Sequence, residues 1–438
     1  MKWVKRGLWV AGWCVWVWLG AGLYRELPRD LGPKACDLGL HDNDNLYGFL
    51  GDGSTILTER VDDKLKQRTL TIRNSLTNAI ERGIDASRFW NANIAAIMPQ
   101  FSLLVCEQPN DGATHPDTPS VVDLRTGEIR SYPRIGRVDR VHRSLPRASF
   151  HYFDPSTKDY SRLTVIDLLS GAELFRWTLP PETRPQYSLT WPSLFVGDSQ
   201  IAVPTRYRRL KDAECFLEAW SITANRLQVK FSTSVVGDYA IGSSSRYVAW
   251  YEMDTQPYGV AVYDVDRGER VLYVPPEKSR LPRGWGSLSV APAFSLDGRR
   301  ILSPPTGCIV DIPTKRRVWQ ARENEAVSRV ADDDWFETVE TWNPTFWKWS
   351  TTFQTFVVRK IADGSIESRN WTSTLAFCQY NADRTLLLKD GVVYRLPLQL
   401  SWKLLALCQT ILALPLVLLW AALRWRRKRR MRMAGAVT

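Results

Sequence analysis

Short apolar runs alternate with polar turns along most of the chain, and one unit of this kind recurs. Its clearest copy is residues 294–319, FSLDGRRILSPPTGCIVDIPTKRRVW, which predicts three strands separated by turns. In each copy a polar residue or tryptophan ends an apolar strand, and a Gly, Asn or Lys follows about four positions later. The marked positions are Asn74, Asp123, Asp167, Trp220, Asp264, Asp311 and Lys360. Their spacing, 44 to 53 residues by subtraction, indicates repeated small sheets.

The alternation inside one strand shows how such sheets would pack. In YVAWYE, residues 247–252, Val248 and Trp250 share one face, and Ala249 and Tyr251 share the other. Both faces are apolar, as in a blade packed between two neighbours. We therefore predict an all-β fold, a β-propeller of seven or eight blades over residues 25–400. A β-sandwich is the alternative, but sandwiches lack a sustained repeat of this period.

The number of blades depends on an incomplete last unit, NADRTLLLKDGVVYRL, at residues 381–396. If residues 31–40 supply its missing outer strand, the ring closes with eight blades, and we favour that arrangement. In every unit the Asp at the strand end can accept hydrogen bonds from turn amides. The glycine that follows can adopt positive φ without strain.

These units resemble the WD-repeat and quinoprotein-like propeller superfamily. The quinoprotein docking pattern is D-x-x-x-G-x-x-x-W, and Asp311, Lys315 and Trp319 match it with Lys in place of Gly. Asp167 and Gly171 match its first part, and the Gly-His and Trp-Asp dipeptides of WD repeats are missing. The resemblance implies the fold of residues 40–397 and no functional residues.

The two ends of the chain are apolar and flanked by basic residues. Residues 7–24 and residues 404–423 carry no charge, which predicts two transmembrane helices. Residues 1–24 form either a retained anchor or a cleaved signal segment. Residues 401–424 are the second predicted helix, since the basic run after it argues against a buried core helix, and residues 425–438 are a basic cytoplasmic tail. With both termini cytoplasmic by the positive-inside rule, the large domain lies extracytoplasmic, periplasmic or at the cell surface.

The net charge of +12 does not indicate a nucleic-acid-binding protein. Three basic residues precede the first apolar segment and seven follow the second, so 12 − 3 − 7 leaves +2 for everything between them. A nearly neutral middle has no basic face that composition alone predicts. We expect the membrane and a protein outside the cytoplasm as partners, with no nucleic acid.

Candidate chemistry is sparse. The four histidines, His41, His115, His142 and His151, have no metal-ligand spacing, and we expect them on loops. Five of the seven cysteines lie outside the apolar ends and none has CxxC spacing. No nucleophile elbow or phosphate-binding loop occurs in the predicted propeller. We expect no catalytic residue, cofactor or metal.

One stretch departs from the repeat, namely DDDWFETVETWNPTFWKWSTTF at residues 332–353. An aromatic residue beside carboxylates is a plausible ligand contact, whereas Trp347 and Trp349 share a strand face that favours the core. The predicted ligand-binding residues are Asp332, Asp333, Asp334, Trp335 and Trp342.

Three hypotheses for function follow. The leading one is a non-enzymatic, membrane-tethered propeller that presents a binding or scaffolding surface outside the cytoplasm. The alternative is a membrane-bound quinoprotein-type dehydrogenase, which needs a cofactor over a tryptophan and a calcium ion; the degenerate docking repeats argue against it. Glycan binding or hydrolysis at the Trp/Asp stretch is the third. The sequence does not indicate an oligomeric state.

Overall fold

The structure is a computed structural model. It describes residues 10–434 apart from 19, 21–28, 42, 52, 90, 108–118, 133–134, 155–158, 180–186, 190–192, 208–214, 234–240, 253–258, 276–290, 331–333, 343–344, 347–348, 351–352, 371–377, 382, 397–398 and 401.

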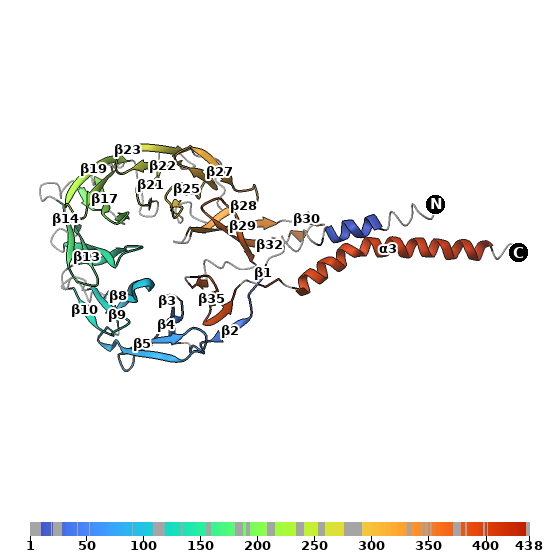
Figure 1. The fold of residues 1–438 in the computed structure, drawn as a ribbon, viewed down its shortest axis with the longest axis horizontal. Helices are drawn as coiled ribbons and strands as arrows, with labels where there is room; N and C mark the ends of the chain where they lie inside the picture. Colours follow the sequence, from blue (N-terminus) through green and yellow to red (C-terminus); the bar gives the residue numbers. More distant parts are fainter. Residues whose placement is uncertain are drawn as a thin grey trace.

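Eight sheets, antiparallel apart from one added strand in the seventh, form a ring of eight blades (Figure 1). Within each blade the first four strands follow chain order from the centre of the ring outward, except in the last blade, and the seventh sheet carries two added strands from the chain ends. The predicted all-β propeller is therefore confirmed, and the number of blades is eight. The described residues contain two further features, a small hairpin between β29 and β32 and helical segments at the two chain ends.

The first four blades span residues 44–233. Blade 1 comprises β3 Asp44–Leu50, β4 Thr55–Asp62, β5 Gln67–Asn74 and β6 Ile80–Asp85, followed by the 3-10 helix η1 Ser87–Phe89. Blade 2 comprises β7 Asn93–Met98, β8 Leu103–Glu107, β9 Pro119–Asp123 and β10 Ile129–Ser131, with the 3-10 helix η2 Pro99–Phe101. Blade 3 comprises β11 Arg137–Val141, β12 Arg147–Asp154, β13 Asp159–Asp167 and β14 Glu173–Thr178. Blade 4 comprises β15 Tyr187–Leu189 and β16 Leu194–Val196, which both pair with β17 Gln200–Tyr207, then β18 Cys215–Ser221 and β19 Arg226–Thr233.

The other four blades complete the ring. Blade 5 comprises β20 Ile241–Ser243, β21 Tyr247–Glu252, β22 Gly259–Asp264 and β23 Glu269–Val274. Blade 6 comprises β24 Ala293–Phe294, β25 Arg300–Ser303, β26 Cys308–Asp311 and β27 Arg316–Gln320. Blade 7 comprises β28 Glu325–Val330, β29 Trp335–Trp342, β32 Phe353–Lys360 and β33 Ile366–Asn370, with the hairpin of β30 Thr345–Phe346 and β31 Trp349–Ser350. Blade 8 comprises β34 Cys378–Tyr380, β35 Leu386–Lys389, β36 Val392–Arg395 and β2 Lys34–Asp37.

The last blade closes the ring with a strand from the beginning of the chain. Strand β2 pairs antiparallel with β36, with Cys36 opposite Val393 and Asp37 opposite Val392. The expectation that residues 31–40 supply the missing outer strand is thus confirmed. Because the first and last parts of the chain share one sheet, the ring has no open edge at its seam.

The marked positions of the repeat end the third strand of successive blades, with one correction. Six of the seven predicted residues, from Asn74 to Lys360, are the last residue of that strand. In blade 4 the equivalent residue is Ser221 rather than Trp220, because the Ser221 hydroxyl accepts the turn amide of Ala224 and Asn225 takes the positive φ of 47°. In a regular copy, Asp123 accepts from the amides of Arg125 and Thr126.

The glycine of this turn also lets the preceding blade approach closely. At Gly364, where φ is 74°, an added Cβ would lie 2.3 Å from the Trp319 ring of blade 6. At Gly268, where φ is 70°, it would lie 2.6 Å from a methyl group of Val229 in blade 4. The glycine therefore serves both the positive φ and the contact between blades.

The second strands bury both faces, as the alternation predicts. Val248 and Trp250 belong to an apolar cluster shared with blade 4, and Ala249 and Tyr251 to one shared with blade 6. All four side chains are at most 1% exposed. Apolar clusters of this kind lie at seven of the eight blade interfaces among the described residues, the exception being that between blades 7 and 8.

Both chain ends attach to blade 7. Strand β1, Arg29–Asp30, pairs parallel with β33, and β37, Gln399–Leu400, pairs antiparallel with β1, so the sheet of blade 7 has six strands. Helix α3, Trp402–Ala434, begins directly after β37 and extends away from the ring beside the helical segment of residues 10–18 (Figure 1).

These end helices differ from the sequence prediction of two transmembrane helices. No helix in the described part of the chain has the length and apolar character that a membrane span requires. Helix α3 also continues without a break past residue 424 into the predicted basic tail, because nothing in the arginine-rich run terminates a helix.

Candidate functional site

The predicted ligand-binding stretch forms one end of blade 7. Asp334 lies in the turn before β29, and Trp335 is the first residue of that strand. Asp332 and Asp333 lie outside the described residues. Trp342 ends β29, and its side chain lies outside the described part of the structure. The structure therefore places Asp334 and Trp335 together and does not bring Trp342 to them, since it lies at the other end of an eight-residue strand.

Asp334 connects blade 7 to blade 6. Its Oδ1 accepts a hydrogen bond of 3.0 Å from the amide of Leu296, and its main-chain oxygen accepts one of 2.8 Å from Ile361. Its φ is 66°, a left-handed conformation that Asp tolerates better than most residues. Burial raises the pKa of the carboxyl above its usual value. The side chain is thus engaged in the contact between blades.

Trp335 connects blade 7 to blade 8. The guanidinium carbon of Arg384 lies 3.8 Å from the centroid of the Trp335 ring, and the ammonium group of Lys360 lies 5.1 Å from it. The tryptophan is half-buried. Its ring is occupied by two cations of the same chain, in the geometry of cation–π contacts. A ligand at this ring would have to displace or share Arg384.

These two contacts belong to a circle of contacts at one mouth of the ring, which we term the turn rim. It consists of the turns between the first and second strands of each blade. At each of the eight interfaces, such a turn touches the next one through the following described contacts. Five are hydrogen bonds, which join the Gly51 amide to the Pro99 oxygen, the Gln100 side chain to the Arg143 oxygen, the His142 ring to the Gly197 oxygen, the Gly197 amide to the Ser244 oxygen, and the Leu296 amide to the Asp334 side chain. Two are close packing contacts, of Gly298 with Ser244 and of Gly53 with Asn381. The last is the cation–π contact of Arg384 with Trp335.

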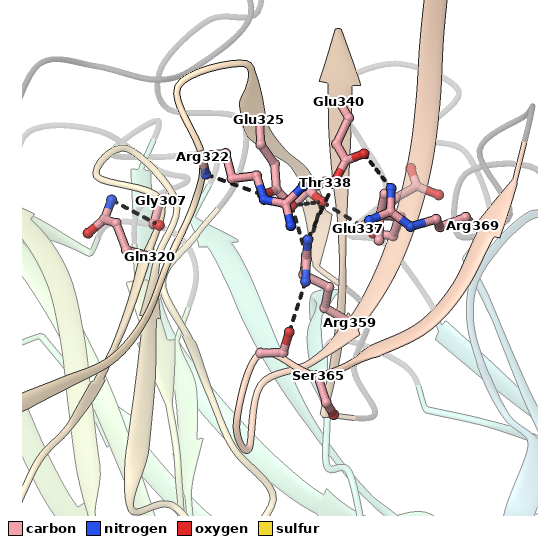
Figure 2. Close-up of polar contacts among 12 residues, drawn as sticks. Gly307, Gln320, Arg322, Glu325, Glu337, Thr338, Glu340, Arg359, Ser365 and Arg369 are labelled. Atoms are coloured by element: carbon pink, nitrogen blue, oxygen red, sulfur yellow. Dashed lines mark hydrogen bonds and ion pairs between the residues drawn. The ribbon is translucent and has the colours of Figure 1, made fainter. Parts of the chain in front are cut away.

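A second polar group, which we term the blade 7 ion cluster, is buried between blades 6 and 7 (Figure 2). The Nε of Arg359 donates to Oε1 of Glu325 at 2.8 Å, and the hydroxyl of Thr338 donates to the same oxygen at 2.5 Å. Nη1 of Arg359 donates to the main-chain oxygen of Gly364 at 3.0 Å. Because alternate residues share a face, Phe336 and Thr338 lie on the same side of β29, and Phe336 contacts Trp319 of blade 6.

The cluster continues toward the other end of blade 7. Glu340 accepts a hydrogen bond from Arg369 and lies 3.7 Å from Nη2 of Arg359, so it bridges the two guanidinium groups. On the facing strand of blade 6, Gln320 donates to the main-chain oxygen of Thr306 at 2.9 Å. The side chains of the two glutamates and two arginines are at most 8% exposed.

The arrangement of the ion cluster suits a structural role better than catalysis. Each carboxylate is bound to an arginine, and a buried carboxylate in an ion pair has no free path to a substrate proton. Among the residues that the structure describes, no three His, Cys, Asp or Glu side chains gather as a metal site requires. The expectations of no metal and no cofactor stay predictions.

A third polar group lies between blades 3 and 4. Asp139 on β11 and His151 on β12 are both fully buried, with Nε2 of His151 3.3 Å from Oδ2 of Asp139. The amide of Ser193 donates to the same carboxyl oxygen at 2.9 Å. Burial raises the pKa of Asp139 to about 6 and lowers that of His151 to about 3. His151 is therefore a core residue, which corrects the expectation that it lies on a loop.

The sequence analysis did not identify the ion cluster. Its signal was present as polar residues at alternate positions of a strand, Thr338 and Glu340 in WFETVETW. Such a pattern is normally the solvent face of a strand. Only the neighbouring blade, which covers that face, turns these residues into buried partners.

Comparisons with known proteins find only distant similarity. No known protein family and no curated protein matches the sequence. Among solved structures, the β-propeller domain of the trilobed protease from Pyrococcus furiosus is 12% identical with a TM-score of 0.37, covering 75% of this chain and 85% of that chain. BamB from Moraxella catarrhalis is 10% identical with a TM-score of 0.32, covering 78% and 100%. The Pan2 WD40 domain from Neurospora crassa is 8% identical with a TM-score of 0.38, covering 70% and 86%. At these identities and scores, the similarity carries no argument about this chain.

Proposed function

We propose that this protein is a non-enzymatic, membrane-tethered propeller that presents a binding or scaffolding surface outside the cytoplasm. In this proposal residues 7–24 and 404–423 are the membrane segments, both termini are cytoplasmic, and the ring binds a protein partner. The observation that carries the proposal is the joint departure of both chain ends from blade 7, through the paired strands β1 and β37. A ring held at one blade leaves the edges and faces of the others accessible.

The composition and exposure of the end helices support an apolar environment around them. Leu407, Ile411, Leu414 and Leu418 of α3 are 54% to 60% exposed, and Trp420 is 47% exposed. Exposed apolar surface of this extent is unfavourable in water and favourable in lipid. The run of basic residues after Leu423 would favour the cytoplasmic, anionic surface of the membrane.

Protease protection on intact cells or spheroplasts tests the proposal. The full chain should pellet with membranes and resist carbonate extraction, and external protease should digest the ring while a C-terminal reporter stays protected. Neutralising the seven basic residues between Arg424 and Arg432 should place the C-terminal reporter outside in a fraction of molecules. A ring that is fully protected, or a chain that is released by carbonate, would contradict the proposal.

A further inference from the structure

The helical segment near the N-terminus has one side that is less exposed than the rest. Gly12 and Trp16 are partly buried and Gly20 is buried, whereas Val10 is 63% and Trp18 is 73% exposed. Residues 12, 16 and 20 are four positions apart and therefore lie on one face of a helix. This face is covered by another part of the chain.

Helix α3 carries the matching side. Leu405, Gln409 and Ala413 are partly buried, with the same spacing of four residues. Residues between them, such as Leu407 and Ile411, are 56% and 60% exposed. The two helices lie side by side and extend away from the ring, and the chain enters the ring after the first helix and leaves it before the second (Figure 1). The helices are therefore antiparallel.

Two contacts fix the position of one helix on the other. The indole Nε1 of Trp16 donates a hydrogen bond of 3.1 Å to the main-chain oxygen of Gln409, which can accept it with a lone pair that the helix does not use. An added Cβ on Gly20 would lie 1.7 Å from the side-chain nitrogen of Gln409. A larger residue at position 20 would therefore require the amide end of the Gln409 side chain to move, and small residues are common at the helix contacts of membrane proteins.

A third contact lies at the base of the pair. Arg29 is opposite Leu400 and Asp30 is opposite Gln399 in the antiparallel pairing of β1 with β37. The strands that follow the first helical segment and precede α3 in the chain are thus hydrogen-bonded to each other. Contacts at the base and along the helices make the N-terminal segment part of one folded unit with α3.

We propose that residues 10–20 are a permanent partner helix of α3, retained in the mature protein rather than removed as a signal peptide. The small residues of the sequence GAG at positions 20–22 permit peptidase cleavage by their size, but Gly20 also packs against the Gln409 side chain in the contact between the two helices. Cleavage there would remove the face formed by Gly12 and Trp16 and leave the Gln409 side of α3 uncovered. This inference rests on the proposed function, since only an exported chain meets a signal peptidase.

The first test uses the unmodified chain with a C-terminal tag, purified from membranes. Its intact mass and its N-terminal peptide should include residues 1–24. An N-terminus that begins near residue 22 in a protein that resists carbonate extraction would overturn the inference and leave the membrane tether standing.

The second test is a cysteine cross-link in a background with Cys14→Ser and Cys408→Ser. G20C with Q409C should form a disulfide under mild oxidation, detected as a linked peptide pair by mass spectrometry, because an added Cβ on Gly20 would lie against the Gln409 side chain. W18C with Q409C is the matched control, since Trp18 lies on the exposed side, and should give at least tenfold less linked peptide. Equal yields would overturn the helix pairing. Strong linkage in a chain released by carbonate would instead overturn the proposed function and support the pairing.

Discussion

Blade 6 meets its two neighbours in different ways. Its contact with blade 5 is an apolar cluster that includes Tyr251, Val260 and Ile301, all fully buried. Its contact with blade 7 combines a smaller apolar cluster around Phe336 with the blade 7 ion cluster. The apolar interface is non-directional and depends on volume, whereas the ionic one depends on geometry and on the presence of every partner. Repetition of the same backbone unit therefore does not impose the same chemistry on successive interfaces.

The largest expected effect comes from removing one partner of the ion cluster. Arg359→Met should lower the free energy of unfolding by about 3–5 kcal/mol, because Glu325 stays buried without its cation. Urea unfolding of the purified protein measures this loss. The double variant R359M/E325Q is the control and should recover most of it, since no charge is then left without its partner at this position. A double variant as unstable as the single one would show that packing, not charge, dominates.

The buried Asp139 offers a change of opposite sign. Asp139→Asn should raise the free energy of unfolding at pH 7.5 by about 3 kcal/mol, because the pKa of about 6 in the folded protein is above the ordinary 3.8. The contribution of the Asp139 carboxyl to the free energy of unfolding is fully present below pH 3.8 and is lost as the pH rises through about 6. The gain from asparagine should therefore shrink to about 1 kcal/mol at pH 4.5.

Urea unfolding at the two pH values checks this dependence. His151 works in the opposite direction, because its lowered pKa makes the folded state lose stability as the pH falls below its ordinary 6.5. The variant keeps His151, so the difference between variant and wild type isolates Asp139. If the stability gained by Asp139→Asn is the same at both pH values, Asp139 does not have a raised pKa in the folded protein. Its negative charge is then balanced by a proton on His151.

The apolar interface should respond less to a single change. Ile301→Val removes one methylene from the fully buried cluster between blades 5 and 6 and should cost about 1 kcal/mol. Urea unfolding measures it beside R359M. Equal losses for the two variants would remove the distinction between the apolar and the ionic interface.

The smallest effect is expected at the turn rim. Arg384→Met removes the cation over Trp335 but keeps the aliphatic stem, and should cost about 0.5–1 kcal/mol. Lys360→Met is the matched control, since its cation lies farther from the ring, at 5.1 Å. A larger loss for Lys360→Met than for Arg384→Met would contradict the assignment of Arg384 as the link between blades 7 and 8.

The repeat was readable in the sequence because it depends on local chemistry. A strand end such as Asp264 and a turn glycine such as Gly268 interact within five residues, so their spacing survives where the rest of the unit varies. Blade 4 shows the limit of this reasoning. Ser221 performs the role of Asp with a hydroxyl, and the pattern alone shifted the assignment by one residue to Trp220.

The candidate ligand-binding site was predicted from residue types, and the structure gives two of those residues contacts that the types did not reveal. Asp334 and Trp335 lie beside Leu296 of blade 6 and Arg384 of blade 8, which are 38 and 49 residues away in the chain. No local pattern contains such partners. A role for this stretch in ligand binding stays a prediction.

The sequence by itself determined the all-β repeat, the alternation that buries both faces of each blade, and the apolar ends, because each is a property of neighbouring residues. Only the tertiary structure decided that Glu325, Arg359 and Glu340 are buried partners, that Trp16 meets Gln409, and that Asp139 lies against His151. Burial and charge pairing depend on which segments the ring brings together. Ring closure joins Lys34–Asp37 to Val392–Arg395, strands more than 350 residues apart, and that pairing determines the neighbours of all the others.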